Sequence, residues 1–179
     1  QREAERLGLT GEDYFLREEL AGANAAATAE GAVQTALEHL DRTLLGLDCL
    51  VTGFGQIGKL LCHRLQGLGA RVTATARKPE DLAWIRAYGY RALETGGLDG
   101  HLAGFGAVFN TVPFPVLTEP LTAQLPRDCL LIDLASVRGI EAAEGGPEVL
   151  WARSLPGRLA PRSAAAAIRD AVYYILLEE

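Results

Sequence analysis

The sequence predicts an α/β fold, a doubly wound parallel sheet of about six strands preceded by a helical lead-in. Three observations support this class. Short apolar segments alternate with helical periodicity from residue 48 onward. The segments are apolar throughout, which is typical of strands buried on both faces. A glycine motif, GFGQIG at 53–58, lies between the first strand and the first helix that follow the lead-in. Together they indicate a Rossmann-like domain.

Length and composition bound the class of protein. The chain has 179 residues, of which 49% are hydrophobic and 22% charged, enough for one domain with a sizeable core. The net charge of -6 offers no general attraction to nucleic acid or to anionic membranes. No apolar run is long enough to span a bilayer, and no signal peptide opens the chain. We therefore expect a cytoplasmic protein with neither nucleic acid nor membrane as a partner.

The cysteines and histidines indicate no metal site. Cys49, Cys62 and Cys129 show neither paired nor metal-ligand spacing, and each lies in an apolar or helical pattern. We predict buried free thiols, which suit a reducing compartment. The three histidines are scattered along the chain, so we expect no metal.

Residues 1–45 are predicted to form a helical lead-in or interdomain connector, and residues 46–179 the nucleotide-binding domain. In the lead-in, Thr10 is the expected cap of a first helix and Thr28 the cap of a second. The apolar stripe of the second helix is predicted to be Val33, Leu37 and Leu40. The sequence contains no methionine, and we expect a fragment or processed chain that lacks an upstream N-terminal domain.

The elements of the domain follow from periodicity and turn residues. Strands are predicted at 49–53, 71–76, 89–93, 106–112, 129–135 and 148–152. Helices are predicted at 57–68, 79–88, 117–125 and 163–179. Gly69 and Gly89 are expected to end the first two helices, and Ser163 to cap the last. The last helix is predicted to bury one apolar face, formed by Ala164, Ala167, Ile168, Ala171, Val172, Ile175 and Leu176.

The glycine motif predicts a dinucleotide site. Gly53 would permit the tight turn, Gly55 would let the backbone approach a pyrophosphate, and Gly58 would let the helix pack closely on the strand. The N–H groups at the start of that helix would then bind the phosphates. We include the intervening Phe54, Gln56 and Ile57 among the expected cofactor contacts. The alternative is a glycine-rich turn without a ligand.

The end of the second strand predicts which cofactor binds. NAD-binding domains carry an acid there for the ribose 2′-hydroxyl, whereas this chain has Thr75 and Ala76, followed by Arg77 and Lys78. Arginine can pair with a 2′-phosphate through two N–H donors. We therefore predict an NADP site with Arg77 as the clamp, assisted by Lys78, and leave NAD open. The alternative is two solvated surface cations.

Further candidate residues leave the fourth and fifth strands. Asn110, Thr111, Val112 and Pro113 leave the fourth strand, and Asp133, Leu134, Ala135 and Ser136 leave the fifth. Because ligands bind at the carboxyl ends of parallel strands, both segments should face the nicotinamide half of the cofactor. Asn110 and Asp133 could equally be turn-forming residues.

The last third of the chain is rich in arginine. Its four arginines in that stretch are Arg138, Arg153, Arg158 and Arg162. Such cations suit an anionic substrate, and solvated loop arginines are the alternative. Arg138, Arg158 and Ser136 are the candidate substrate contacts. No Ser-His-Asp or Cys-His arrangement is present, and no general base stands out.

Several segments together resemble the family of dipicolinate synthase A subunits. The resemblance runs from about Tyr14 to the C-terminus, and DLAS and LPG-x-x-AP are its most specific pieces. The segments are NAAATAEGAVQTALE, GFGQIGKLL, ARKPEDLAWIRAYGY, VFNTVP, LIDLAS and LPGRLAPRSA.

The resemblance implies a two-domain subunit that dehydrogenates dihydrodipicolinate, a small dicarboxylate, to dipicolinate, with NADP as the cofactor. It further implies a flavoprotein-like B subunit as partner and the mother-cell cytoplasm of a sporulating bacterium; homo-oligomerisation is left open. It places Leu155, Pro156 and Gly157 in a loop near the reaction centre, with Pro156 and Gly157 among the expected cofactor contacts.

The chain departs from the family pattern at two places. Residues 137–140 read VRGI where the family has x-P-G-G, and residues 162–165 read RSAA where it has x-T-A-G. Both departures lie on the substrate side, so a relative with another substrate is left open.

Two alternative functions remain. A 2-hydroxyacid-dehydrogenase-like enzyme needs a cleft histidine, and none follows His101. A non-catalytic sensor using NAD would prefer an acid at the end of the second strand.

Overall fold

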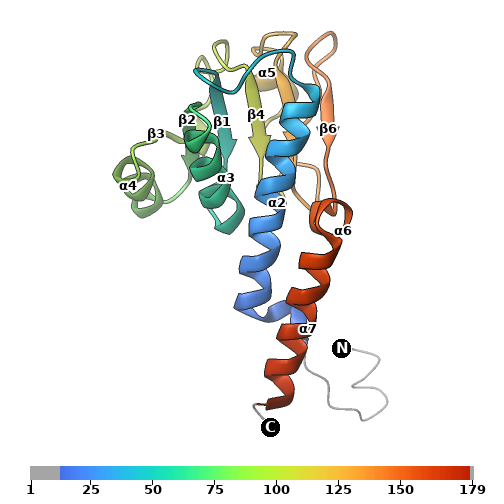
Figure 1. Ribbon diagram of the computed structural model, residues 1–179. Coiled ribbons are helices and arrows are strands. Elements are labelled where there is room, and N and C mark those ends of the chain that lie inside the picture. Colours follow the sequence, from blue (N-terminus) through green and yellow to red (C-terminus); the bar gives the residue numbers. More distant parts are fainter. Residues whose placement is uncertain (1–12, 178–179) are drawn as a thin grey trace, which may run out of the picture.

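A computed structural model of the chain describes residues 13–177 and has a Rossmann-like α/β architecture (Figure 1). Its six strands form one parallel sheet in the order β3-β2-β1-β4-β5-β6. The strands are β1 (Asp48–Thr52), β2 (Arg71–Ala76), β3 (Arg91–Glu94), β4 (Ala107–Asn110), β5 (Leu130–Asp133) and β6 (Val149–Trp151). All six predicted strands are confirmed. The strand order reverses between β1 and β4, where open α/β sheets bind their ligands.

The strands are apolar throughout because both faces of the sheet are buried. Along β1, Cys49 and Val51 enter one core cluster and Leu50 enters the cluster on the opposite face. In β4, Phe109 and Val108 divide in the same way. Successive strand side chains point to opposite faces, so burial on both sides removes any need for polar alternation.

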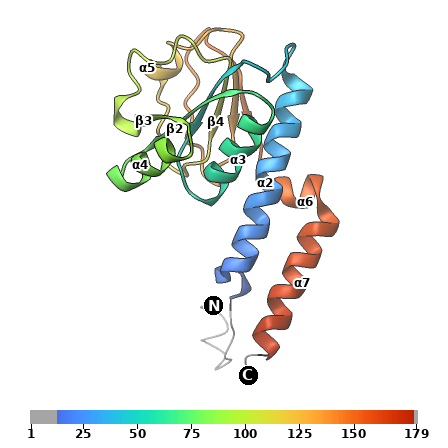
Figure 2. The same cartoon turned by 60° about the vertical axis from the view of Figure 1, so that its left-hand side comes forward.

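Helices cover one face of the sheet more fully than the other. The helices are α2 (Glu18–His39), α3 (Gln56–Gly67), α4 (Pro79–Ala87), α5 (Glu119–Thr122), α6 (Leu155–Leu159) and α7 (Pro161–Leu177), with 3₁₀ turns η1 (Tyr14–Leu16) and η2 (Thr95–Gly97). Figures 1 and 2 show α2 and α3 on one face and α5 on the other. The predicted ends of α3 and α4 are confirmed, because Gly69 and Gly89 have φ of 82° and 83°.

The described part of the lead-in consists of the 3₁₀ turn η1 and one long helix, α2, where the sequence predicted two helices. Thr28 is no cap: it lies inside α2, and its hydroxyl donates a 2.7 Å hydrogen bond to the carbonyl of Asn24. Thr10 lies outside the described residues. The predicted apolar stripe is confirmed at Val33 and Leu40, which pack against the core, and is wrong at Leu37, which is 55% exposed. The buried face consists of small residues, including Ala29, Ala32 and Ala36. Small side chains allow neighbouring helices to approach closely, which the stripe prediction ignored.

Helices α2 and α7 lie side by side and project beyond the sheet (Figures 1 and 2). The chain reaches α7 through α6, which sequence analysis had predicted as a loop. A Cβ on Gly31 of α2 would lie 3.0 Å from Cβ of Leu155, so α6 packs directly on the α2 backbone. Ser163 is not the cap, because α7 begins at Pro161. Of the predicted apolar face of α7, only Ala171 is buried.

The helix that the sequence predicts before the fifth strand is shorter than expected. The helix predicted at 117–125 is reduced to the four residues of α5, because Pro120 and Pro126 restrict its length.

The prediction of buried free thiols is confirmed, because Cys49, Cys62 and Cys129 are buried and form no disulfide. Among the described residues, no helix combines the length and the apolar character that crossing a bilayer requires.

Candidate nucleotide-binding site

The carboxyl ends of the parallel strands share one edge of the sheet, and a cleft of about 390 Å³ opens there. Its walls come from the start of α3 and from the exits of β4, β5 and β6. The lining residues are Ile57, Thr111, Pro113, Leu134, Ala135, Ser136, Arg153 and Ser154. Five of the predicted cofactor contacts and one predicted substrate contact, Ser136, therefore meet in a single cleft.

The glycine motif forms a tight turn in which two glycines are required by packing. Gly53 has φ of 92°, and a Cβ there would meet Thr111 Oγ1 at 2.6 Å and Val112 Cγ2 at 2.8 Å. A Cβ on Gly58 would collide with the carbonyl oxygen of Gly53. Any larger residue at either position would therefore push the turn away from β4 or α3 away from β1.

Gly55 differs from these two glycines because its Cβ position is open. Apart from its two chain neighbours, no described residue has an atom within 4 Å of a Cβ built there, and its φ of -78° is accessible to any residue. Gly55 is the N-cap of α3 and offers no side-chain cap to the first turn. The first turn of this 12-residue helix includes Ile57, which lines the cleft, so its N–H groups lie beside the cleft, an arrangement that suits a phosphate.

The other motif residues support the turn. The ring of Phe54 is buried, with centroids 6.2 Å from Tyr88 and 6.4 Å from Tyr90, so its side chain lies in the core. Ile57 is half-buried and lines the cleft. The amide of Gln56 donates a 3.0 Å hydrogen bond to the carboxylate of Glu18, which links the starts of α3 and α2.

Asn110 and Asp133 form a buried polar network at the strand exits. Strand register aligns Thr52 with Asn110 and Asn110 with Asp133. The Asn110 amide donates 2.8 Å and 3.0 Å bonds to Asp133 and to the carbonyl of Val112, and its oxygen accepts from the Thr52 hydroxyl at 2.6 Å. Both side chains are fully buried and fully engaged, so their contacts are those of turn-forming residues.

The Asp133 carboxylate also shapes the loop that follows β5. It accepts hydrogen bonds from the backbone N–H of Ala135 at 3.2 Å, Gly139 at 2.8 Å and Ile140 at 3.3 Å. Gly139 is essential here because a Cβ would lie 2.6 Å and 2.7 Å from the carbonyls of Val112 and Phe114. The network fixes the segment that carries Ser136 and Arg138.

The end of β2 lacks the usual acid, and a threonine occupies its interior position. Thr75 is fully buried, and its hydroxyl accepts a 3.3 Å hydrogen bond from the N–H of Gly53. Arg77 and Lys78 follow the last strand residue, Ala76; both are exposed, and neither has an acidic partner in the described part of the chain. Register places Glu94 of β3 beside Ala76, an acid that sequence analysis did not consider.

The arginines in the last third of the chain differ in their position relative to the cleft. Arg153 lines the cleft, whereas Arg158, Pro156 and Gly157 belong to α6 and are absent from the lining. Arg138 lies over the ring of Trp151. Ser154 has the left-handed φ of 56°, rare for a residue other than glycine. Arg153 is one of the four arginines that the sequence offers for an anionic substrate, but it is not among the predicted contacts, and Ser154 is not predicted at all; the position of Arg153 directly after the last strand was the available signal.

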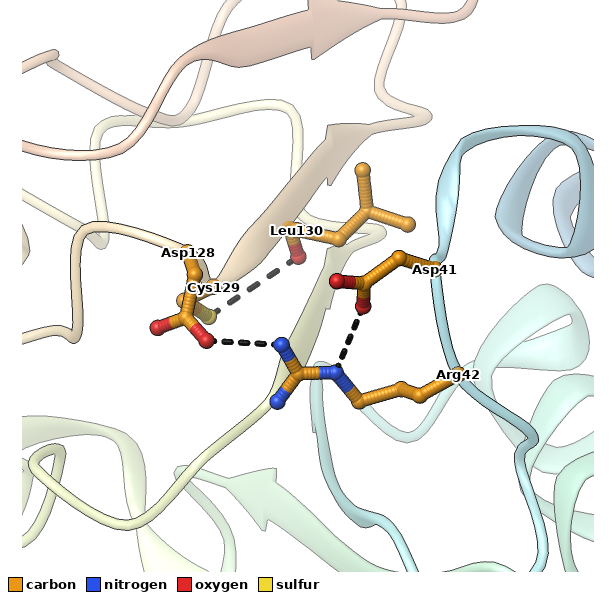
Figure 3. Close-up of polar contacts among 5 residues, drawn as sticks. All are labelled: Asp41, Arg42, Asp128, Cys129 and Leu130. Carbon is orange, nitrogen blue, oxygen red and sulfur yellow. Dashed lines mark hydrogen bonds and ion pairs between the residues drawn. The ribbon is translucent and has the colours of Figure 1, made fainter.

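A second hollow, of about 340 Å³, lies at the opposite end of the sheet and is a structural junction. Figure 3 shows the Arg42 guanidinium between Asp41 and Asp128, with hydrogen bonds of 2.9 Å and 2.7 Å. These pairs join the segment after α2 to the residues before β5. The bonds to Asp41 and then Asp128 raise the pKa of Arg42, and Arg42 lowers the pKa of Asp128. All three side chains are exposed. The glycine motif is at the other edge, so we assign no ligand here.

Neither metal ligands nor catalytic bases gather in the described structure. Between residues 13 and 177, no cluster of three or more His, Cys, Asp or Glu side chains could hold a metal ion. The residues that line the cleft include no histidine and no carboxylate. The described residues that line the cleft can therefore bind and orient a ligand through hydrogen bonds and the charge of Arg153.

Known proteins share this geometry, although no family model matches the chain. The A subunit of dipicolinate synthase from Bacillus subtilis (strain 168) is 30% identical over 168 residues, covering 92% of this chain and 57% of that protein. The chain thus spans little more than half of that relative.

Solved structures show the same similarity as the sequence comparison. The A subunit of dipicolinate synthase from Bacillus halodurans superposes with a TM-score of 0.90 at 28% identity, over 97% of this chain and 61% of that chain. A transhydrogenase from Sinorhizobium meliloti, with a TM-score of 0.77 at 22% identity over 88% of this chain and 55% of that chain, shares the fold. The resemblance to the dipicolinate synthase A subunits is thereby confirmed over nearly the whole chain, and the fold is Rossmann-like.

Proposed function

We propose that this chain is the NADP-binding domain of an oxidoreductase of the dipicolinate synthase A type, which dehydrogenates dihydrodipicolinate to dipicolinate. The observation that carries the proposal is the open Gly55 position at the start of α3, beside a cleft of about 390 Å³. A site that packs tightly around Gly53 and Gly58 and leaves only Gly55 open suits a ligand that approaches the backbone closely.

The cofactor would lie across the strand ends in a defined order. Its 2′-phosphate would meet Arg77 and Lys78 beyond β2, and its pyrophosphate the N–H groups at Gly55 and Gln56. The nicotinamide would occupy the cleft beside Ile57 and the exits of β4 and β5. Asn110 and Asp133 would act indirectly, by holding those exits through buried hydrogen bonds.

Bound NADP⁺ supplies the hydride acceptor. In the proposed reaction, dihydrodipicolinate loses a hydride to the cofactor and a proton to a base or to solvent, and the ring becomes aromatic. The chain would bind and orient the substrate, with the hydroxyls of Ser136 and Ser154 and the side chain of Arg153 at the cleft wall. Because no carboxylate or imidazole of the described residues lines the cleft, we propose that the proton leaves to a group outside these residues or to water.

The whole reaction is proposed for a longer protein. The chain spans 57% of the Bacillus subtilis relative, and we propose that an upstream domain completes the substrate side of the site. On the basis of the same relationship, we propose a flavoprotein-like B subunit as partner and a location in the mother cell of a sporulating bacterium. The buried free thiols suit a reducing cytoplasm.

Two alternatives make different demands on the cleft. A 2-hydroxyacid dehydrogenase needs a histidine paired with a carboxylate near the nicotinamide. Here His101 precedes β4, at the opposite edge of the sheet, and the cleft lining holds no imidazole. A non-catalytic nucleotide sensor would bind the cofactor without turnover.

The experiment is to mix the protein, extended to the full length of its relatives, with NADP⁺ and freshly generated dihydrodipicolinate, with and without the B subunit. NADPH is followed by absorbance and dipicolinate by chromatography, and equal amounts of both products are expected. Binding of NADP⁺ without either product would favour the sensor. Oxidation of 2-hydroxy acids without dipicolinate formation would favour the dehydrogenase alternative. Failure of the chain to bind any dinucleotide would overturn the proposal.

A further inference from the structure

Two arginine side chains meet on one aromatic ring at the edge of the cleft. The guanidinium carbons of Arg138 and Arg153 each lie 4.6 Å from the ring centroid of Trp151. The two carbons are therefore no more than 9.2 Å apart, twice the distance to the shared centroid. Arg138 comes from the loop after β5 and Arg153 from the segment after β6, so two separate strand exits bring cations to one place.

Hydrogen bonds fix the backbone on both sides of this pair. The indole N–H of Trp151 donates to the carbonyl of Ala135 at 3.1 Å, and the N–H of Ala152 donates to the carbonyl of Asp133 at 2.9 Å. The residue after Arg138, Gly139, is held by the Asp133 carboxylate at 2.8 Å. Both arginines thus project from segments that the buried network has ordered, in contrast to arginines on a free loop.

The charge of the pair is not neutralised within the described chain. Arg138 and Arg153 are exposed, and among residues 13–177 neither forms an ion pair with a carboxylate. Two like charges at this separation repel each other, and the face of Trp151 offsets only part of that cost. A guanidinium over an aromatic ring keeps its in-plane N–H donors available, and these donors match a carboxylate in geometry.

The position of the pair connects it to the cleft. Arg153 lines the cleft itself, together with Ser154, whose left-handed backbone turns the chain immediately after Arg153. β6 is the last strand of the sheet, so Arg153 lies on the side of the cleft away from β2 and Arg77. The pair is therefore too far along the sheet to serve the adenosine end of a dinucleotide: β2 and β6 are four strand spacings apart, about 19 Å.

We propose that Arg138, Trp151 and Arg153 form a dicarboxylate-binding site, in which each guanidinium binds one carboxylate of a small planar substrate. The inference rests on the proposed function, because the nicotinamide must occupy the adjoining part of the cleft for the substrate to reach it. It goes beyond that function by assigning the substrate's two charges to two named residues, one of which, Arg138, stands where the related family has a proline. The simpler role, in which both arginines only cover the indole ring, predicts no ligand.

The test is calorimetric titration of the protein, extended to the full length of its relatives and saturated with NADP⁺, with dipicolinate and with picolinate, which has one carboxylate. The wild type should bind dipicolinate more tightly. Arg138→Gln and Arg153→Gln should each weaken dipicolinate about 10- to 100-fold, the effect of losing one charge-assisted contact. In both variants the preference for two carboxylates over one should shrink. Arg153→Lys keeps the charge without the fork and should lie between Arg153→Gln and the wild type.

Arg86→Gln is the matched control, because it removes one exposed positive charge from α4, away from the cleft. It should change neither acid's affinity. The proposal is overturned if Arg138→Gln and Arg153→Gln behave like Arg86→Gln, or if they weaken both acids equally. It is also overturned if the wild type binds NADP⁺ but not dipicolinate. NADP⁺ titrations of the same proteins distinguish failure of the proposed function from failure of the dicarboxylate site. A wild type that binds dipicolinate but no dinucleotide would contradict the proposed function and would still support the dicarboxylate site.

Discussion

The side-chain amide of Asn110 donates a 2.8 Å hydrogen bond to the carboxylate of Asp133, and both residues are fully buried at the ends of neighbouring strands. The remaining bonds of Asp133 go to three backbone N–H groups of the loop that follows. The buried carboxylate of Asp133 therefore fixes the loop that forms one wall of the cleft, although the carboxylate itself does not line the cleft.

Asp133→Asn should lower the free energy of unfolding by about 2–3 kcal/mol. In either orientation, the new amide NH₂ would face backbone or side-chain N–H donors, so a buried donor would lose its acceptor. Urea unfolding followed by circular dichroism measures the loss. Asp128→Asn removes an exposed partner of Arg42 and should cost much less, because solvent screens surface pairs. Equal losses in the two variants would contradict the role assigned to Asp133.

Gly55→Ala should separate folding from nucleotide binding. Apart from the two chain neighbours, the added methyl group meets no atom of residues 13–177 within 4 Å, so the free energy of unfolding should be unchanged or slightly higher. A pyrophosphate close to the backbone would meet that methyl group, so dinucleotide affinity should fall at least about tenfold.

Gly22→Ala is the control for Gly55→Ala. Gly22 lies in α2, and beyond its chain neighbours and the backbone of its own helix, no described atom lies within 4 Å of its Cβ position. This variant should be slightly more stable than the wild type and should bind dinucleotide normally. If Gly55→Ala also bound dinucleotide with wild-type affinity, the open position at the start of α3 would have no part in the site.

The three thiols should be unreactive in the folded protein. Burial raises the pKa of Cys49, Cys62 and Cys129 to about 12, so almost no thiolate is present at pH 8. A disulfide reagent such as Ellman's should react with all three only after the chain unfolds in urea. Rapid reaction of any thiol in the native protein would contradict its burial.

The same shifts predict how stability depends on pH. The folded state favours the neutral thiols, whereas the unfolded chain releases these protons near pH 8.5. The stabilisation is complete below that pH and is lost as pH rises toward about 12. The free energy of unfolding should therefore fall with increasing pH above about 8.5, and replacing Cys62 by Ala should make the fall less steep.

Sequence patterns predicted the sheet well because its strands are buried on both faces. A continuous apolar segment such as Cys49–Val51 identifies a buried strand without any information about its neighbours. Gly69 and Gly89 identified the helix ends, because the chain adopts a positive φ there, which favours glycine. The turn at Gly53 was also predictable, because the motif combines a strand, a helix and glycines at fixed spacing.

The sequence did not predict features that depend on distant contacts. The buried face of α2 is made of small residues, and a pattern of large apolar residues selected Leu37, which is exposed. The burial of Asn110 and Asp133 depends on strand register, and the meeting of Arg138 with Arg153 depends on a loop that the Asp133 network folds. Neither relationship has a fixed spacing along the chain.

The central claim, an NADP site whose 2′-phosphate is bound by Arg77, is tested most directly by titrating NADP⁺ and NAD⁺ against the wild type and Arg77→Ala. A charge-assisted contact to phosphate contributes ~1.5–3 kcal/mol, so the variant should bind NADP⁺ about 10- to 100-fold more weakly and NAD⁺ almost unchanged. Lys78→Ala should have a smaller effect, since lysine acts as a point charge, and added salt should reduce the preference for NADP⁺. Tighter binding of NADP⁺ than of NAD⁺ by the wild type, lost in Arg77→Ala, is the predicted result. Equal affinities in the wild type, or an equal loss of both cofactors in the variant, would contradict it and leave Arg77 and Lys78 as solvated cations at the end of β2.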